Sequence, residues 1–516
     1  MKLPSLLSRN ALLRPRFAWL VVILLLVVLS FFSLLWLPTS AGDRAASQLP
    51  AAEVPAPAAW AGGAHALYPT AAPGAPGPDL ETDVRATTAL THTAFLPLLL
   101  RDYWQAPDSL LGVAFYGNME QEAVVKASQI GARWARLPLV WSWIEPANTT
   151  PENYQWPDSF DDCLARLSAK KIKVILTLGG NPSWAATYPG GPIDRTDIGE
   201  LAEFMAAAVA HYSLPPYNVK YWEFYNEPDN GSEFYAERGA SYWGNEPAAY
   251  AGMLAAVYQP MKTADPEAQI VFGGLAYDCW ESEGGPFVEE FLDGVLSNHG
   301  GDYFDVMNFH YFPTFRPNWE EYGTGIIGKA TYIRDKLASY GVQKPLICTE
   351  TSMWSDEAHG GSDELQSRYV PQVFARSMAT DLKTTIWLML IDGDEVGIRK
   401  YGLLNPDLSP KPAYFAYRTL AQQLAPANYI WTLGSAEAGS DQIEAYGFLT
   451  EDGSTLIIVA WTENEQEYNM WLVADEVVVV DKYGDQTTVY DGDDGVVDGH
   501  VRVTIGPSPV YLRFLH

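Results

Sequence analysis

The 516-residue chain has few cysteines and few basic residues. Its three cysteines exclude a disulfide-stabilised scaffold and a four-cysteine zinc site, and they allow one disulfide at most. Lysine and arginine total 33 against 63 aspartates and glutamates, which gives a net charge of −30. Binding to nucleic acid through phosphate contacts needs a basic face, so this composition argues against it.

The sequence also lacks the short motifs of several enzyme classes. It contains no Gly-x-Ser-x-Gly elbow, no His-Glu-x-x-His zinc motif and no Walker A phosphate loop. Cys163 is expected in a helix, Cys279 in a loop, and Cys348 inside a strand as a small hydrophobic side chain. The acidic stretch 491–495 does not have the spacing of an EF-hand, so a solvated hairpin is favoured over a calcium loop. We predict no metal ion and no cofactor.

A long apolar run lies near the N-terminus. Residues 17–37 are uncharged, and the run has about the length that spans a bilayer as a helix. All the basic residues among the first 16 precede it, so the positive-inside rule leaves the N-terminus in the cytoplasm and exports the rest. We predict that residues 1–38 form a cytoplasmic stub and a transmembrane helix. A cleavable signal is the alternative, because Thr39-Ser40-Ala41 offers small residues to a peptidase; a buried helix of the soluble fold is a third reading.

Residues 39–104 are predicted to be a linker. Much of this segment is rich in alanine, proline and glycine, as in 51–57 and 71–78. Such a composition buries too little apolar surface to offset the entropy of ordering, so a semi-extended tether is expected. The apolar stretch Phe95–Leu100 near its end is expected to be a strand or a docking segment of the folded body.

Between residues 105 and 428, short apolar strands alternate with amphipathic helices. The eight predicted strands are Leu110–Tyr116, Trp134–Leu139, Lys173–Leu178, Val219–Tyr225, Ile270–Gly274, Phe304–Phe309, Leu346–Thr349 and Thr385–Leu390. Eight consecutive β/α units predict an α/β fold, a closed (β/α)8 barrel. An open doubly wound sheet is the alternative, but no glycine-rich dinucleotide fingerprint follows the first strand.

From residue 429 to residue 516 the helical period is lost. Six short apolar runs remain, at Ile443–Leu449, Thr455–Trp461, Met470–Val473, Val477–Val480, Val501–Ile505 and Val510–Phe514. Glycine and aspartate turns separate them, which predicts a small antiparallel β-sandwich. Residues 430–516 hold 16 acidic and three basic residues, a net charge of −13.

Two glutamates stand at predicted strand ends, where the catalytic groups of a barrel lie. Pro228 cannot continue a β-ladder, so the fourth strand is expected to stop at Glu227. Glu350 stands where the apolar run of the seventh strand ends. Strands 4 and 7 lie across the barrel mouth from each other, so Glu227 and Glu350 are predicted to face each other over a cleft.

Two facing carboxylates meet the requirement of glycoside hydrolysis. One carboxyl group, with a raised pKa, protonates the leaving oxygen, and the other attacks the sugar or activates water. The alternative is that both glutamates are solvated residues of the rim.

The tripeptide Asn226-Glu227-Pro228 at a strand end resembles the Asn-Glu-Pro motif of clan A glycoside hydrolases, most closely families 39 and 5. The resemblance covers about residues 108–425. It implies that Glu227 is the acid/base, that Glu350 is the nucleophile, and that the reaction retains configuration through a covalent glycosyl-enzyme. The tripeptide recurs at residues 245–247, where no strand precedes it, so that copy is predicted to start a helix.

The same resemblance implies substrate-binding roles for other residues. Asn226 would bind the sugar 2-hydroxyl, and Arg136 on the second strand would support the nucleophile carboxylate. Alternatively, Arg136 pairs only with Glu223 on the fourth strand.

Later strands carry the remaining candidates that the resemblance implies. His310 and Tyr311 would form a histidine and aromatic pair near the nucleophile. Trp387 on the eighth strand would be the platform under the sugar. The alternative for His310 and Trp387 is a packed place in the core.

Two further loops carry candidates of their own. Asn181 ends the third strand and either contacts sugar hydroxyls or closes a turn. Trp141 and Trp143 follow the second strand and either stack on outer sugars or pack the loop.

We therefore predict a membrane-anchored glycosidase outside the cytoplasm, acting on a β-linked oligo- or polysaccharide. A non-catalytic carbohydrate-binding protein and a transglycosidase with the same two glutamates are the alternatives. The segment Asn230–Gly244 after the fourth strand is expected to wall one side of the cleft.

Overall fold

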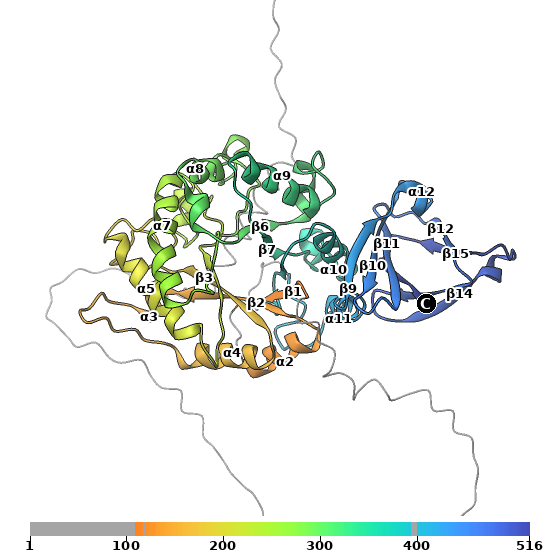
Figure 1. The fold of residues 1–516 in the computed structure, drawn as a ribbon, viewed down its shortest axis with the longest axis horizontal. Coiled ribbons are helices and arrows are strands. Elements are labelled where there is room, and N and C mark those ends of the chain that lie inside the picture. Colours follow the sequence, from red (N-terminus) through yellow and green to blue (C-terminus); the bar gives the residue numbers. More distant parts are fainter. Residues whose placement is uncertain (1–108, 117–119, 394–399, 516) are drawn as a thin grey trace, which may run out of the picture. The chain divides into compact units, whose positions relative to one another are not determined.

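The computed structural model describes residues 109–116, 120–393 and 400–515. Its first part is a sheet of eight parallel strands in the order β5-β4-β3-β2-β1-β8-β7-β6. Parallel bridges from Val271 to Val306 and from Leu275 to Phe309 join β5 to β6. The sheet is therefore closed, which confirms the (β/α)8 barrel and excludes the open doubly wound sheet. Figure 1 shows the strands inside a ring of helices.

The strands of the barrel lie close to the predicted positions. They are β1 (Leu111–Ala114), β2 (Trp134–Val140), β3 (Lys173–Gly179), β4 (Tyr221–Phe224), β5 (Gln269–Val271), β6 (Met307–Tyr311), β7 (Leu346–Thr351) and β8 (Thr385–Trp387). Several are shorter than their apolar runs, because the run continues into loop residues that still pack in the barrel interior. Leu388, which follows β8, is such a residue and is buried.

Helices connect successive strands and cover the barrel. The longer ones are α2 (Gln121–Gln129), α4 (Asp158–Ala169), α5 (Ile198–Tyr212), α7 (Pro247–Ala264), α8 (Phe291–Ser297), α9 (Ile326–Ser339), α10 (Asp363–Ala379) and α11 (Pro412–Leu424). Helix α7 begins at Pro247 with Glu246 as its N-cap, which confirms that the second Asn-Glu-Pro starts a helix. Cys163 lies in α4 and Cys348 in β7, and all three cysteines are free and buried.

The C-terminal part is an antiparallel β-sandwich. Its larger sheet has the order β14-β13-β16-β11-β10-β9, and β12 and β15 form a separate pair. The strands are β9 (Ala427–Thr432), β10 (Ile443–Thr450), β11 (Thr455–Thr462), β12 (Tyr468–Val473), β13 (Glu476–Asp481), β14 (Gln486–Tyr490), β15 (His500–Ile505) and β16 (Val510–Leu515).

Two of these strands, β9 and β14, were not predicted. Both are edge strands of the larger sheet, and β14 has no fully buried side chain. Edge strands commonly carry polar residues that discourage further pairing, so they lack an apolar run.

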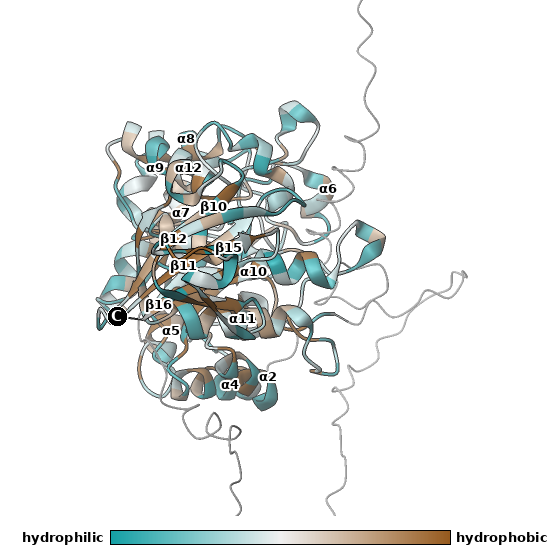
Figure 2. Ribbon diagram, turned by 90° about the vertical axis from the view of Figure 1, so that its right-hand side faces the viewer, coloured by the Kyte–Doolittle hydropathy of each residue, from teal (hydrophilic) through white to brown (hydrophobic). Residues whose placement is uncertain are grey.

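The larger sheet of the sandwich is buried on both faces. In β11, Ile457, Val459 and Trp461 join the core cluster of the barrel, whereas Ile458 and Ala460 pack with β12 and β15. This double burial explains the unbroken apolar run of β11. Figure 2 shows brown, apolar segments in these inner strands and teal on the exposed surfaces of α2 and α4.

A buried ion pair joins the two parts. Arg376 of α10 binds both carboxylate oxygens of Glu444 in β10, at 2.7 and 2.6 Å. It also contacts Glu463, which follows β11, and its guanidinium lies 5.2 Å from the ring centre of Trp461. The sandwich thus packs on α10 through apolar side chains and polar contacts. The Arg376–Glu444 pair is more buried than the pairs Arg368–Glu465 and Lys482–Glu364.

The predicted anchor and linker, residues 1–38 and 39–104, lie outside the described residues. Within the described ranges, no helix has the length and apolar character needed to cross a membrane. The acidic stretch 491–495 forms a short 3-10 turn, and Asp491 accepts the backbone N–H groups of residues 498–500.

Candidate active site

The motif Asn226-Glu227-Pro228 lies in the first residues after β4. The strand ends at Phe224, earlier than predicted, and Tyr225 and Glu227 have left-handed backbones with φ of 66° and 49°. The N–H of Glu227 donates to the carbonyl of Gly274 at 2.9 Å. A strained backbone held by a neighbouring strand end is typical of a functional site.

Glu350 lies inside β7, one residue before its end. The pairing of β7 with its neighbours shifts register beside Glu350. Such an irregularity re-aims side chains. It lets the consecutive residues Thr349 and Glu350 both contact groups of the barrel interior, Glu223 and Arg136 respectively.

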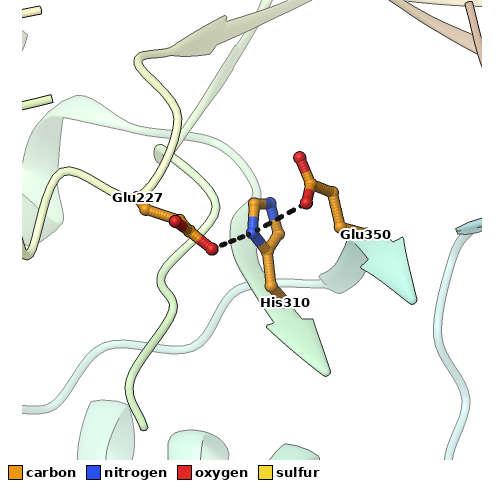
Figure 3. Close-up of side chains that lie close together, drawn as sticks. All are labelled: Glu227, His310 and Glu350. Atoms are coloured by element: carbon orange, nitrogen blue, oxygen red, sulfur yellow. Dashed lines mark hydrogen bonds and ion pairs between the residues drawn. The ribbon is translucent and has the colours of Figure 1, made fainter. Parts of the chain in front are cut away.

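His310 of β6 lies between the two glutamates (Figure 3). Its Nδ1 is 3.1 Å from Oε1 of Glu227 and 3.6 Å from Oε2 of Glu350. One oxygen of each carboxylate and one nitrogen of His310 all lie within 4.8 Å of one another. The exposed fractions are 7% for Glu227, 0% for Glu350 and 1% for His310, so the two carboxyl groups face each other in a desolvated site.

Arg136 of β2 connects Glu350 to Glu223. Its Nη1 donates to Oε1 of Glu350 at 2.5 Å, while Nε and Nη2 donate to the two oxygens of Glu223 at 2.7 Å each. Arg136 also donates to Tyr116 and to Oδ1 of Asn226, both at 2.9 Å. Both predicted partners of Arg136 are therefore present, because a guanidinium offers five donors in a fixed fork.

Glu223 is fully buried and is surrounded by donors. Besides Arg136, it accepts hydrogen bonds from the Thr177 hydroxyl at 2.7 Å, the Gly274 N–H at 3.1 Å and Nδ2 of Asn308 at 2.9 Å. A buried carboxylate needs hydrogen bonds to both of its oxygens to offset the cost of its desolvation.

Burial raises the pKa of both facing carboxyl groups. For Glu350 it raises the pKa to about 7, and the Arg136 guanidinium opposes the rise. For Glu227 burial is again the largest cause, and the charges of Glu350 and Asp229 raise the pKa further, to well above the ordinary value. When the pair holds one proton, that proton therefore favours Glu227, because the Arg136 guanidinium stabilises the ionised form of Glu350.

The comparisons with known proteins bear on this geometry. No protein-family model matches the chain. No curated protein matches it in sequence. Among solved structures, a family 39 glycoside hydrolase from the gut symbiont Bacteroides cellulosilyticus WH2 is similar with a TM-score of 0.61. It is 21% identical, over 80% of this chain and 81% of that chain.

The chain shares its (β/α)8 fold with further solved glycoside hydrolases. A glucosidase from Croceicoccus marinus is similar with a TM-score of 0.57 and 15% identity, over 79% of this chain and 96% of that chain. A GH30 endoxylanase from Clostridium papyrosolvens C71 has a TM-score of 0.53 and 12% identity, over 79% and 95%. At these identities the similarity establishes the fold, and the activity has to be argued from the site.

Within this fold, the structure brings five of the predicted site residues together. They are Glu227, Glu350, Arg136, Asn226 and His310. Oδ1 of Asn226 accepts from Arg136, which orients the amide with Nδ2 as its donor.

Three predicted residues are not brought to the carboxylate pair. Trp387 is fully buried, donates its indole N–H to the carbonyl of Tyr401 at 3.0 Å, and packs against Tyr369 of α10. Its neighbour Ile386 belongs to the inner cluster of the barrel instead. Trp387 therefore faces the helix layer, because successive residues of a strand point to opposite sides.

Tyr311 and Asn181 also contact neighbouring loops rather than the carboxylate pair. Tyr311 follows His310 on β6 and is buried, with its hydroxyl beside the backbone of Gly325 before α9. Asn181 donates to the carbonyl of Gly191 at 2.9 Å and accepts from the Tyr225 hydroxyl at 3.0 Å. Its amide thus closes the loop after β3, which is the alternative left open by the sequence.

An aromatic group near the strand ends was missed by sequence reasoning. Phe312 follows β6, Trp354 follows β7 and Tyr401 follows β8. The ring centre of Tyr401 lies 6.4 Å from that of Phe312 and 6.1 Å from that of Trp354. Tyr116, just after β1, was missed as well. Tyr116 ends the first predicted strand and the other three residues follow predicted strands, so position at or after a strand end was the available signal.

The loop candidates divide between core and surface. Trp141 in α3 (Trp141–Ile144) is buried and stacks on Phe204, whereas Trp143 is 51% exposed. The segment 230–244 contains α6 (Glu233–Ala236) and pairs with the loop after β3 through a bridge between Gly190 and Ser241.

Glu227, His310 and Glu350 are close enough to one another to surround a cation. The Arg136 guanidinium already supplies a positive charge to Glu350, and a second cation beside it would be repelled. We therefore assign the cluster to proton chemistry. A second group of neighbouring carboxylates, Glu152, Glu200 and Glu203, is more exposed, as acidic side chains without an ion commonly are.

Proposed function

We propose that the protein is a retaining glycoside hydrolase that cleaves a β-linked oligo- or polysaccharide. The observation that carries this proposal is the pair of buried carboxyl groups, Glu227 and Glu350, with oxygens within 4.8 Å of each other. Retaining enzymes hold their two carboxyl groups about 5–5.5 Å apart, and inverting enzymes leave about 6.5–9.5 Å for a water molecule. The short separation supports double displacement.

In this proposal Glu350 is the nucleophile. Its Oε1 is held by Arg136, while Oε2 is buried and has no hydrogen-bond partner among the described residues. A buried carboxylate oxygen that faces the acid suits attack on the anomeric carbon. The bond from that carbon to the leaving oxygen breaks as the bond to Glu350 forms.

Glu227 acts first as acid and then as base. Its proton passes to the leaving oxygen in the first step, and the resulting carboxylate takes a proton from water in the second. The water oxygen replaces Glu350 on the anomeric carbon, so two inversions give net retention. Asn226, whose amide is fixed by Arg136, is placed to donate to a sugar hydroxyl beside the nucleophile.

The place of action is part of the same proposal. The basic residues before the apolar run of residues 17–37 support a membrane-anchored protein whose folded part lies outside the cytoplasm. Membrane fractionation, with protease added to intact cells, tests this. Release of the protein into soluble cytoplasm would contradict it.

Activity is tested with the full-length chain, purified in detergent, on a panel of aryl glycosides and polysaccharides. Proton NMR of the first product shows whether the β-anomer is formed first, as retention of a β-glycoside requires. The Glu350→Ala variant is the matched control and should lose hydrolysis while keeping its fold. Glycan binding without turnover in the wild type would favour the binding protein, and transfer products in excess of hydrolysis would favour the transglycosidase.

A further inference from the structure

The hydroxyl of Thr349 in β7 lies behind His310, on the side away from Glu227. Its Oγ1 is 3.2 Å from Nε2 of His310. The same oxygen lies 3.2 Å from Oε1 of Glu223 and 3.1 Å from Oδ1 of Asn308. The residues involved are fully or almost fully buried, so these contacts are not shared with bulk water.

On that side the hydroxyl of Thr349 accepts from Nδ2 of Asn308 at 2.8 Å, and its own single proton faces two acceptors, Oε1 of Glu223 and Oδ1 of Asn308. Glu223 forms an ion pair with Arg136 and accepts further hydrogen bonds from Thr177 and Gly274. The amide of Asn308 is oriented because its Nδ2 donates to Glu223 at 2.9 Å, which leaves Oδ1 as an acceptor of the Thr349 N–H at 3.2 Å. An oxygen of the ion-paired Glu223 accepts a hydroxyl proton more strongly than the nitrogen of a neutral ring does. The Thr349 proton therefore goes to Glu223 or Asn308 rather than to Nε2, and the hydroxyl is an acceptor toward His310.

His310 carries one ring proton. Burial, followed by the charges of Arg136 and Lys329, lowers the pKa of His310 well below its ordinary value, so the ring is neutral. Because Thr349 accepts from Nε2, that nitrogen bears the proton and Nδ1 has a lone pair. The contact of 3.1 Å between Nδ1 and Oε1 of Glu227 is then a hydrogen bond in which the carboxyl group of Glu227 donates.

We propose that Thr349 is a positioning residue that fixes the tautomer of His310, so that His310 accepts the proton of Glu227 and keeps Glu227 in its acid form. The hydrogen bonds run in one direction, from Glu227 to His310, from His310 to Thr349, and from Thr349 to Glu223 or Asn308. The tautomer follows from these contacts and from the neutral, buried ring of His310, and its catalytic role rests on the proposed function.

This chain of hydrogen bonds affects the protonation of Glu227 in both steps of the proposed reaction. When Glu227 gives its proton to the leaving oxygen, its carboxylate faces the lone pair of Nδ1, which disfavours the ionised form. Glu227 therefore regains a proton readily from the water that attacks the glycosyl-enzyme. Without the Thr349 hydroxyl the ring can carry its proton on Nδ1 and donate to the Glu227 carboxylate, which favours the ionised form instead.

Other charged or titratable groups face the same site, and a test has to hold them constant. They are Glu350 on β7, Arg136 on β2, Glu223 on β4, Asp229 after β4, Tyr116 after β1 and Lys329 on α9. Thr349 itself is uncharged, so its replacement changes the direction of hydrogen bonding without adding or removing a charge.

The tautomer is measured directly by 15N NMR of the full-length chain with labelled histidine. The chain has eight histidines, and the His310→Asn variant assigns the signal. The proposal expects the proton on Nε2 in the wild type and in Thr349→Ser, and a shift of the proton toward Nδ1 in Thr349→Val. A proton on Nδ1 in the wild type, or an unchanged tautomer in Thr349→Val, would overturn it.

The pH profile of kcat/KM is the second measurement. In Thr349→Val the limb at high pH should move down by about one pH unit, whereas Thr349→Ser should keep the wild-type profile. Thr349→Ala replaces Thr349→Val if the larger side chain prevents folding, and circular dichroism checks the fold of each variant. Equal profiles for all folded variants would overturn the proposal. If no substrate is hydrolysed, the proposed function fails and the NMR measurement alone decides the tautomer.

Discussion

Arg136 binds Glu223 through two parallel hydrogen bonds of 2.7 Å, from Nε to Oε2 and from Nη2 to Oε1. This bidentate pair fixes the plane of the guanidinium, and only Nη1 is left to reach Glu350, at 2.5 Å. The orientation of the proposed nucleophile therefore depends on Glu223, a carboxyl group that is fully buried. In the proposed reaction Glu223 acts through Arg136.

Removing the charge of Glu223 should destabilise the protein. In Glu223→Gln one partner of a buried ion pair is lost, and breaking such a pair costs about 3–5 kcal/mol. Urea unfolding measures the change in the free energy of unfolding. The exposed Glu289→Gln is the control and should change it by less than about 0.5 kcal/mol. Equal free energies of unfolding for the two variants would mean that the Arg136–Glu223 ion pair does not stabilise the fold.

Replacing the proposed acid should affect substrates unequally. In Glu227→Ala, kcat/KM should fall steeply for glycosides with poor leaving groups and much less for aryl glycosides whose leaving group needs no proton. A series of aryl glycosides with graded leaving-group pKa values measures this. A uniform loss across the series would contradict the acid role of Glu227.

The pH profile of kcat/KM should be bell-shaped, and both of its limbs should lie at higher pH than the pKa of an ordinary carboxyl group. Activity needs Glu350 ionised, so it is lost as the pH falls through its pKa, which burial raises to about 7. It also needs Glu227 protonated, so it is lost as the pH rises through its pKa, which is raised well above the ordinary value. The two limbs of kcat/KM report the pair together. A low-pH limb near 4.5, the unperturbed value for a glutamate, would argue against this environment.

Removal of metal ions should leave the activity unchanged. The positive charge at the nucleophile comes from Arg136, and proton transfer is assigned to Glu227. Dialysis against a chelator, followed by assay with and without added divalent cations, measures the effect. Loss of activity that a specific cation restores would show that the cluster of Glu227, His310 and Glu350 binds metal.

Replacing Arg376 should weaken the contact between the barrel and the sandwich. Arg376→Met leaves Glu444 buried without its bidentate partner, which should lower the free energy of unfolding by about 3–5 kcal/mol. Chemical denaturation followed by tryptophan fluorescence measures it. Arg502→Met, at an exposed position on β15, is the control. A small effect at Arg376 would indicate that apolar packing and the other ion pairs across the junction, such as Arg368–Glu465 and Lys482–Glu364, hold the two parts together.

Sequence reasoning was most successful where the pattern is local and repeated. Eight apolar runs separated by amphipathic helices can bury their faces only as a parallel sheet covered by helices, so the barrel followed from periodicity. Pro228 and the apolar run before Glu350 placed both glutamates near strand ends. Edge strands β9 and β14 were missed because an edge needs no apolar run.

The sequence by itself determined the fold class and the two proposed catalytic carboxylates. Which face each side chain occupies was decided only by the tertiary structure. The register irregularity in β7 turns both Thr349 and Glu350 to the interior, while Trp387 faces the helices and Tyr311 lies beside Gly325, away from the carboxylate pair. A shift of one residue exchanges the two faces of a strand, and strand pairing, which is a long-range interaction, sets that shift. The partners of Arg136 and His310 come from separate strands, so only closure of the barrel brings them together.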